Sequence, residues 1–203
     1  MPAKKLIVLL EEPSMEAALQ VLLPKMLRQG MEFELRQFGS KTELLKRLPQ
    51  RLEAYAKWLP KEALILIVVD RDDEDCRDLK KRLDNIALEA GLVTRTASKG
   101  KQFQVINRIA IEELEAWFWG DWGAMLKAYP KLPATLPQRA GYRDPDAIKG
   151  GTCEAMERQL KGKGYFTQGL RKLELARTVA PLMDPDVNRS ASFNCLRDVV
   201  ASL

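Results

Sequence analysis

The chain has 203 residues, of which 46% are hydrophobic and 30% are charged, and its formal net charge is +5. This length and composition predict a globular protein with one main core, and no stretch approaches the roughly 20 apolar residues that cross a membrane. The absence of histidine excludes Ser-His-Asp and Cys-His catalysis and histidine-ligated zinc, so any chemistry must use carboxylates, lysine or a metal ion. Three scattered cysteines form no disulfide framework and no secretory signal precedes the first expected strand, so we expect a cytoplasmic protein.

The predicted elements of the first half alternate between strands and helices. Residues 6–10 read as a buried strand, residues 15–27 as an amphipathic helix interrupted by Pro24, and residues 31–35 as a half-buried strand. Ser40 and Glu43 form a plausible capping box that opens a helix reaching about residue 59. The apolar run 63–69 predicts a second buried strand, and a helix from about 73 to 90 follows it.

Residues 92–96 and 103–111 are expected to form further strands around a loop at 98–101, and residues 112–119 should be helical. This succession predicts an α/β domain over residues 1–122, with a mostly parallel, Rossmann-like sheet flanked by helices. Prolines and glycines then interrupt the chain, and short helical patterns occur near 152–160, 168–182 and 192–202. Residues 123–203 are therefore expected to form a basic helical appendage packed on that domain.

Acidic residues are concentrated directly behind the buried strand 63–69. Positions 70–75 contain five carboxylates and Arg71, a net charge of −4 that leaves +9 for the rest of the chain. Glu11 follows the first strand in the same way, and in parallel sheets ligands bind beyond the carboxyl ends of the strands. Because Mg²⁺ and Mn²⁺ prefer carboxylate oxygens, we expect a Mg²⁺ or Mn²⁺ site here, and the basic remainder suits a nucleic acid laid across it.

Glu11 after one strand, with Asp70 and Asp72 as an Asp-x-Asp after a later strand, resembles the signature of the Toprim fold of topoisomerases, bacterial primases and overcoming-lysogenization-defect (OLD) nucleases. The resemblance covers about the first 115 residues. It implies that these three carboxylates hold Mg²⁺ for cleavage or transfer at a phosphodiester. Toprim proteins usually carry glycine after the first glutamate, whereas this chain has Glu12.

A second likeness spans nearly the whole chain. Small Toprim-type proteins encoded beside an ATPase in bacterial defence-like gene pairs share four motifs with it: residues 11–14, 69–76, 111–117 and 190–193. This resemblance implies a nuclease role and an ATPase partner protein.

Three further residues are candidates for the site. Glu16 can reach back from the first helical turn, and an acid of the 112–115 segment, Glu115, can complete a second metal position, although either also suits an ordinary helix. Lys99, in a glycine-containing loop, can stabilise a phosphate or leaving group, although a flexible surface lysine is the commoner case.

The combined expectation is a Mg²⁺-dependent nuclease, or a related phosphodiester-cleaving enzyme, in which Glu11, Asp70, Asp72 and Lys99 act in catalysis. The alternative is a non-catalytic Toprim-like module that binds nucleic acid or an ATPase, which the missing glycine favours. A haloacid-dehalogenase-like phosphatase with Asp70 as nucleophile is a third possibility, but it predicts Thr or Val where Glu74 stands.

Overall fold

The computed structural model describes residues 4–203, and its centre is a four-stranded sheet in which all neighbouring strands are parallel. The strand order is β2-β1-β3-β4. The expected α/β class with a parallel sheet is confirmed. The strands are β1 (Lys5–Leu10), β2 (Glu32–Gln37), β3 (Ala63–Asp70) and β4 (Val105–Ala110).

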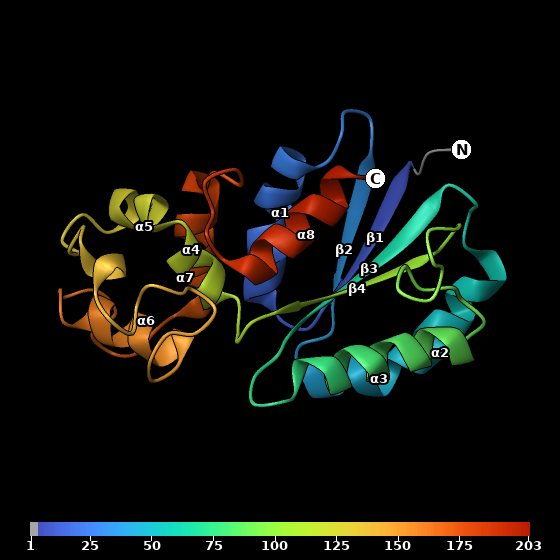
Figure 1. The fold of residues 1–203 in the computed structure, drawn as a ribbon, viewed down its shortest axis with the longest axis horizontal. Coiled ribbons are helices and arrows are strands. Elements are labelled where there is room, and N and C mark those ends of the chain that lie inside the picture. The colour runs from blue at the N-terminus through green and yellow to red at the C-terminus, as the bar shows by residue number, and fades with distance from the viewer. Residues whose placement is uncertain (1–3) are drawn as a thin grey trace.

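Helices cover both faces of the sheet (Figure 1). One face carries α1 (Pro13–Met26) and α8 (Ala191–Ala201), and the other carries α2 (Lys41–Trp58) and α3 (Cys76–Glu89). The two buried central strands have apolar side chains on both faces. Leu6, Val8 and Leu10 of β1 belong to the α1 side, whereas Ile7 and Leu9 belong to the α2 side. This double burial explains why these strands read as continuous apolar runs.

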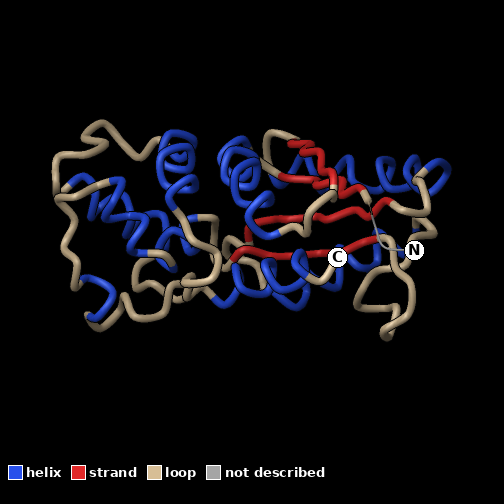
Figure 2. The backbone as a smooth tube through the Cα atoms, turned by 90° about the horizontal axis from the view of Figure 1, so that it is seen from above, coloured by secondary structure: helices blue, strands red, loops and turns tan. Residues whose placement is uncertain are grey.

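A group of shorter helices lies beyond the carboxyl ends of the strands (Figures 1 and 2). Their apolar side chains join the core on the α1 side of the sheet in one continuous cluster. The sequence 123–203 therefore packs on the sheet domain, and its last helix, α8, covers part of the sheet itself. The group consists of α4 (Glu115–Gly120), α5 (Trp122–Ala128), α6 (Thr152–Lys161) and α7 (Lys172–Val179), with 3-10 turns at Leu136–Gln138 and Ala180–Leu182.

The cap residues explain where two of the helices begin. Ser40 accepts a hydrogen bond from the Glu43 backbone N–H at 3.2 Å, as the capping-box pattern predicts. The helix expected from residue 73 begins instead at Cys76, because the Asp75 carboxylate accepts hydrogen bonds from the backbone N–H groups of residues 77 and 78 and so acts as the N-cap.

The expected strand 92–96 is wrong. Only an isolated bridge joins Thr94 to Val105, because the Thr94 hydroxyl and carbonyl accept hydrogen bonds from the Ala97 and Ser98 backbone N–H groups and turn the chain. The helix expected over 112–119 begins only at Glu115, so Glu112 and Glu113 precede it. No helix within residues 4–203 is long and apolar enough to cross a membrane.

Candidate functional site

The first two acidic turns meet at the carboxyl edge of the sheet. The backbone N–H of Asp70 donates a hydrogen bond to Oε1 of Glu11 at 2.8 Å, and both side chains are buried. The meeting follows from the register, because β1 and β3 are parallel neighbours with Leu10 opposite Val68. The spatial condition on which the predicted site depends is therefore met for Glu11 and Asp70.

Glu115 is the third buried acid at this edge of the sheet, with 1% of its surface exposed. It opens α4, and the segment before that helix is fastened to α8 by Ser192. The Ser192 hydroxyl accepts hydrogen bonds from the Ile111 backbone N–H at 3.3 Å and from the Trp117 indole at 3.2 Å. Asp146 holds Ser192 in turn by accepting from its backbone N–H at 2.8 Å. These contacts place Glu115 close enough to Asp70 for their charges to interact.

Burial makes all three carboxyl groups reluctant to ionise, and neighbouring negative charges add to the effect. Burial raises the pKa of Glu11 to about 7, and it raises the pKa of Glu115 to about 7 as well. Burial, followed by the charges of Glu11 and Glu115, raises the pKa of Asp70 well above its ordinary value. Glu12 adds negative charge to each of the three.

The donor set fits a hard divalent cation. Four buried carboxylate oxygens have no hydrogen-bond partner within residues 4–203: Oε2 of Glu11, Oδ1 of Asp70 and both oxygens of Glu115. Buried polar atoms are normally satisfied, and unpaired oxygens of three neighbouring acids are costly. A cation bound to these oxygens would supply the missing partner and the missing charge.

Asp72 lies on the rim of this buried set. Its backbone is in the left-handed region, with φ of 51°, and its side chain is half exposed. The Lys41 ammonium lies 3.1 Å from its Oδ2 and 2.7 Å from a Glu74 carboxylate oxygen, and it also donates to the Arg71 carbonyl at 2.9 Å. Burial lowers the pKa of Lys41, but its two acidic partners raise it above the ordinary value. The charge of Asp72 still reaches Glu11.

A second acidic group adjoins Glu115. Ligand atoms of Glu113, Glu115 and Cys153 all lie within 4.8 Å of one another. The Lys172 ammonium is 2.7 Å from a Glu113 oxygen and 3.8 Å from a Glu115 oxygen. Burial lowers the pKa of Lys172, whereas Glu115 and Glu113 raise it above its ordinary value, so Lys172 stays charged and partly neutralises both acids.

An open cleft of about 350 Å³ lies beside these acids. Its charged lining is entirely acidic within the described residues, but Asp72, Glu112 and Glu113 are already paired with Lys41, Arg71 and Lys172. The remaining negative charge, on Asp73 and Glu154, disfavours an anion such as phosphate, and a bound cation would offset it. The cleft is lined by Asp72, Asp73, Glu112, Glu113, Gly150, Gly151 and Glu154.

Two predicted residues form no hydrogen bond or ion pair with this cluster. Glu16 is half-buried in α1, and its carboxylate makes no hydrogen bond or ion pair with any residue of the described chain. Lys99 is exposed in the loop before β4, at the amino edge of the sheet, so placing it beside the acids was wrong. Six strand residues, about 20 Å, separate the two edges along β4.

Sequence patterns did not point to Lys41, Lys172 or Cys153. Lys41 begins α2 and Lys172 begins α7, and neither has a motif beside it that marks an ion pair with a distant acid. Glu12 departs from the Toprim pattern, and its charge acts on all three buried acids.

The fold and site together define an α/β protein with a buried acidic centre at the carboxyl edge of a parallel sheet. The chain belongs to the family described as a domain of unknown function, DUF4276, whose model matches residues 10–203. The match includes Glu11, Asp70, Glu115 and the helices of the C-terminal part. Comparison with curated proteins gave no match, and comparison with solved structures gave none either.

Proposed function

We propose that this protein is a divalent-metal-dependent enzyme that cleaves phosphodiester bonds, in the manner of Toprim-type nucleases. The observation that carries the proposal is the burial of Glu11, Asp70 and Glu115 together, with four carboxylate oxygens that lack a hydrogen-bond partner among residues 4–203. Their position at the carboxyl edge of a parallel sheet is the usual position of a ligand site in this fold class.

In this proposal, Glu11, Asp70 and Glu115 hold Mg²⁺ or Mn²⁺, and Asp72 supports them from the rim. The bound ion would lower the pKa of a water molecule and neutralise charge that develops on the phosphate. Glu11 has a second role, because its Oε1 also fixes the Asp70 backbone. The acidic cleft beside the site would bind a phosphodiester more tightly with metal present.

Nucleic acid is the proposed substrate class, and a cytoplasmic location and an ATPase partner complete the proposal. The charge distribution supports the choice of substrate, since the chain outside residues 70–75 carries a net +9. The ATPase partner is proposed because the chain resembles proteins encoded beside ATPases. It predicts that cleavage depends on, or is stimulated by, an adjacently encoded ATPase.

Calorimetric titration with Mn²⁺ and Mg²⁺ tests the metal site. The wild type should bind at least one ion per chain, and Asp70→Asn should abolish the heat of binding. Asp78→Asn is the matched control, because it removes the same charge from an exposed position in α3 and should bind like the wild type. Equal binding by wild type and Asp70→Asn would remove the basis for a metal at this site.

Activity is tested by incubating the protein with plasmid, single-stranded DNA and tRNA in the presence of each divalent ion, with and without the adjacent ATPase. Cleavage should require the ion and should be lost in Asp70→Asn but not in Asp78→Asn. Cleavage that persists in Asp70→Asn would come from a contaminant or from another site.

A second candidate function is a non-catalytic module that binds nucleic acid or an ATPase. The observation that favours it is the ion pair between Lys41 and Asp72, because a lysine ammonium there can stand in place of a metal. This alternative predicts nucleic-acid or ATPase binding that is indifferent to divalent ions and to Asp70→Asn.

A further inference from the structure

We propose that Arg95 and Arg108 form a second phosphate-binding site, at the flank of β4 beside α8, which holds the backbone of the nucleic acid away from the acidic centre. The inference rests on the proposed nucleic-acid substrate but not on catalysis. It gives a role to the basic loop before β4, whose Lys99 does not reach the acids.

The stretch from residue 91 to residue 111 contains no acid. Its charged residues are all cations: Arg95, Lys99, Lys101 and Arg108. In a chain with 28 acids and 33 basic residues, 21 consecutive positions with four cations and no acid are a local excess of positive charge. Such an excess attracts a polyanion.

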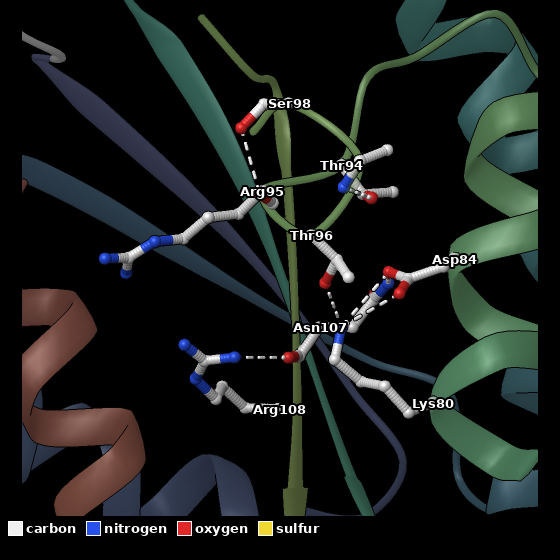
Figure 3. Close-up of polar contacts among 9 residues, drawn as sticks. Lys80, Asp84, Thr94, Arg95, Thr96, Ser98, Asn107 and Arg108 are labelled. Carbon is white, nitrogen blue, oxygen red and sulfur yellow. Dashed lines mark hydrogen bonds and ion pairs between the residues drawn. The ribbon is translucent and has the colours of Figure 1, made fainter. Parts of the chain in front are cut away.

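The two arginine side chains extend to the same side of β4, as Figure 3 shows. Arg108 is half-buried, and its Nε donates to the Cys195 carbonyl of α8 at 3.1 Å while one terminal nitrogen donates to the Asn107 carbonyl at 2.9 Å. Arg95 is exposed, and its guanidinium lies over the Phe103 ring at 5.9 Å. Both guanidinium groups are thus held in place by neutral groups.

Neither guanidinium forms an ion pair with any acid in residues 4–203. The nearby acid is Asp84, and its two oxygens are occupied by the Lys80 ammonium, at 3.1 and 3.2 Å, and by the Asn107 amide at 2.7 Å (Figure 3). Burial lowers the pKa of Arg108, and the charge of Arg95 lowers it further. Two neighbouring guanidiniums without an ion-pair partner would be stabilised by an anion, and a planar guanidinium is well suited to phosphate.

The location points to the backbone of a polymer. Arg95 is hydrogen-bonded to Val105 at the start of β4, and Arg108 lies two residues before Ala110, which pairs with Asp70. Measured along the strand, the two arginines are therefore about 17 Å and about 7 Å from the level of Asp70. The longer distance corresponds to about five base pairs of duplex at about 3.4 Å each. One nucleic acid can therefore contact the arginines and the acidic centre at the same time, whereas a free phosphate cannot.

Binding of labelled oligonucleotides, measured by fluorescence anisotropy in EDTA, tests this inference without metal or cleavage. The probes are single-stranded DNA, duplex DNA and RNA of about 20 nucleotides. Arg95→Gln and the double variant with Arg108→Gln should each raise the Kd at least about fivefold, and each lost contact should reduce the salt slope by about 0.7 to 0.9. Arg36→Gln is the matched control, because Arg36 lies on the opposite edge strand and is paired with Glu34 at 3.5 Å.

Several outcomes would overturn the inference. One is a Kd and salt slope that are unchanged in Arg95→Gln, whose exposed position keeps the test valid even if Arg108→Gln disturbs folding. Another is an equal loss of oligonucleotide affinity in Arg36→Gln.

Inorganic phosphate titrated alone should bind far more weakly than the oligonucleotides, and equally tight binding would assign the site to a small anion instead. Arginine-dependent binding to phosphatidylserine vesicles without binding to oligonucleotides would assign it to a lipid surface. A failed metal titration would not change the oligonucleotide-binding result, so the metal-site proposal and the arginine-site proposal can fail separately.

Discussion

The Asp70 backbone N–H donates to the Glu11 carboxylate across 59 residues of sequence, at 2.8 Å. This bond makes Glu11 both a structural acceptor and a candidate ligand. Only one of its oxygens is used, and the other, Oε2, is buried without a partner. The two roles can be separated by mutation.

Glu11→Gln keeps an oxygen that can accept from Asp70, but it removes the negative charge. We expect this variant to fold as well as the wild type and to lose divalent-metal binding. Glu11→Ala leaves the buried N–H of Asp70 unsatisfied and should lose about 1–3 kcal/mol of unfolding free energy. Urea denaturation and calorimetric Mn²⁺ titration measure the two effects. Normal metal binding by Glu11→Gln would contradict the assignment of Glu11 as a ligand.

Without metal, stability should fall as the pH rises from about 4.5 to about 7. Glu11 and Glu115 have pKa values raised to about 7 in the folded protein, against 4.5 ordinarily, so the folded state binds more protons than the unfolded state in this interval. The Tm in EDTA should therefore be lower at pH 8 than at pH 5, and Mg²⁺ should restore it at pH 8.

Glu115→Gln should reduce this pH dependence, because the buried side chain no longer loses a proton. Glu154→Gln, at an exposed position of α6, serves as the control and should keep the wild-type dependence. Identical Tm-against-pH curves for wild type and Glu115→Gln would show that Glu115 does not remain protonated in the folded state.

Lys172→Met should destabilise the protein mainly at high pH. The substitution removes the cation 3.8 Å from buried Glu115 and 2.7 Å from Glu113, which leaves a buried acid without a counter-charge. The loss should be about 1–3 kcal/mol of unfolding free energy at pH 8 and smaller at pH 5, where Glu115 is protonated. Urea denaturation at both pH values measures it, with Lys163→Met at an exposed position as control. A loss independent of pH would indicate that Lys172 acts through packing alone.

Lys41→Met should strengthen metal binding by about twofold to fivefold, the range expected for removing one partly exposed ion pair. The reason is that the Lys41 ammonium, 3.1 Å from Asp72, competes with a metal for that carboxylate. Lys46→Met is the control, because Lys46 lies on the same helix and is paired only with Glu43. Calorimetric Mn²⁺ titration of the three proteins decides the point, and unchanged or weaker binding by Lys41→Met would mean that Lys41 does not compete.

The buried strands of the sheet, and the acids at their carboxyl ends, could be predicted from the amino-acid sequence. The apolar runs of β1 and β3 predict buried strands, and the carboxyl ends of parallel strands share an edge, so Glu11 and Asp70 were expected at the same edge. Their hydrogen bond depends on β1 and β3 being neighbours in the sheet. Local side-chain hydrogen bonds shifted the element boundaries, as Asp75 did for α3 and Thr94 did for the expected strand 92–96.

The tertiary structure alone decided which other groups reach the acids. Glu115 is brought to Asp70 by Ser192 of α8, Lys41 turns to Asp72, and Lys99 lies at the opposite edge of the sheet. These outcomes depend on contacts between segments up to about 80 residues apart, as in the 81-residue separation of Ile111 and Ser192. Hydrophobic periodicity specifies which face of an element is buried, but it carries no information about which distant charge will lie beside it, and that is the physical reason why only the folded chain could show it.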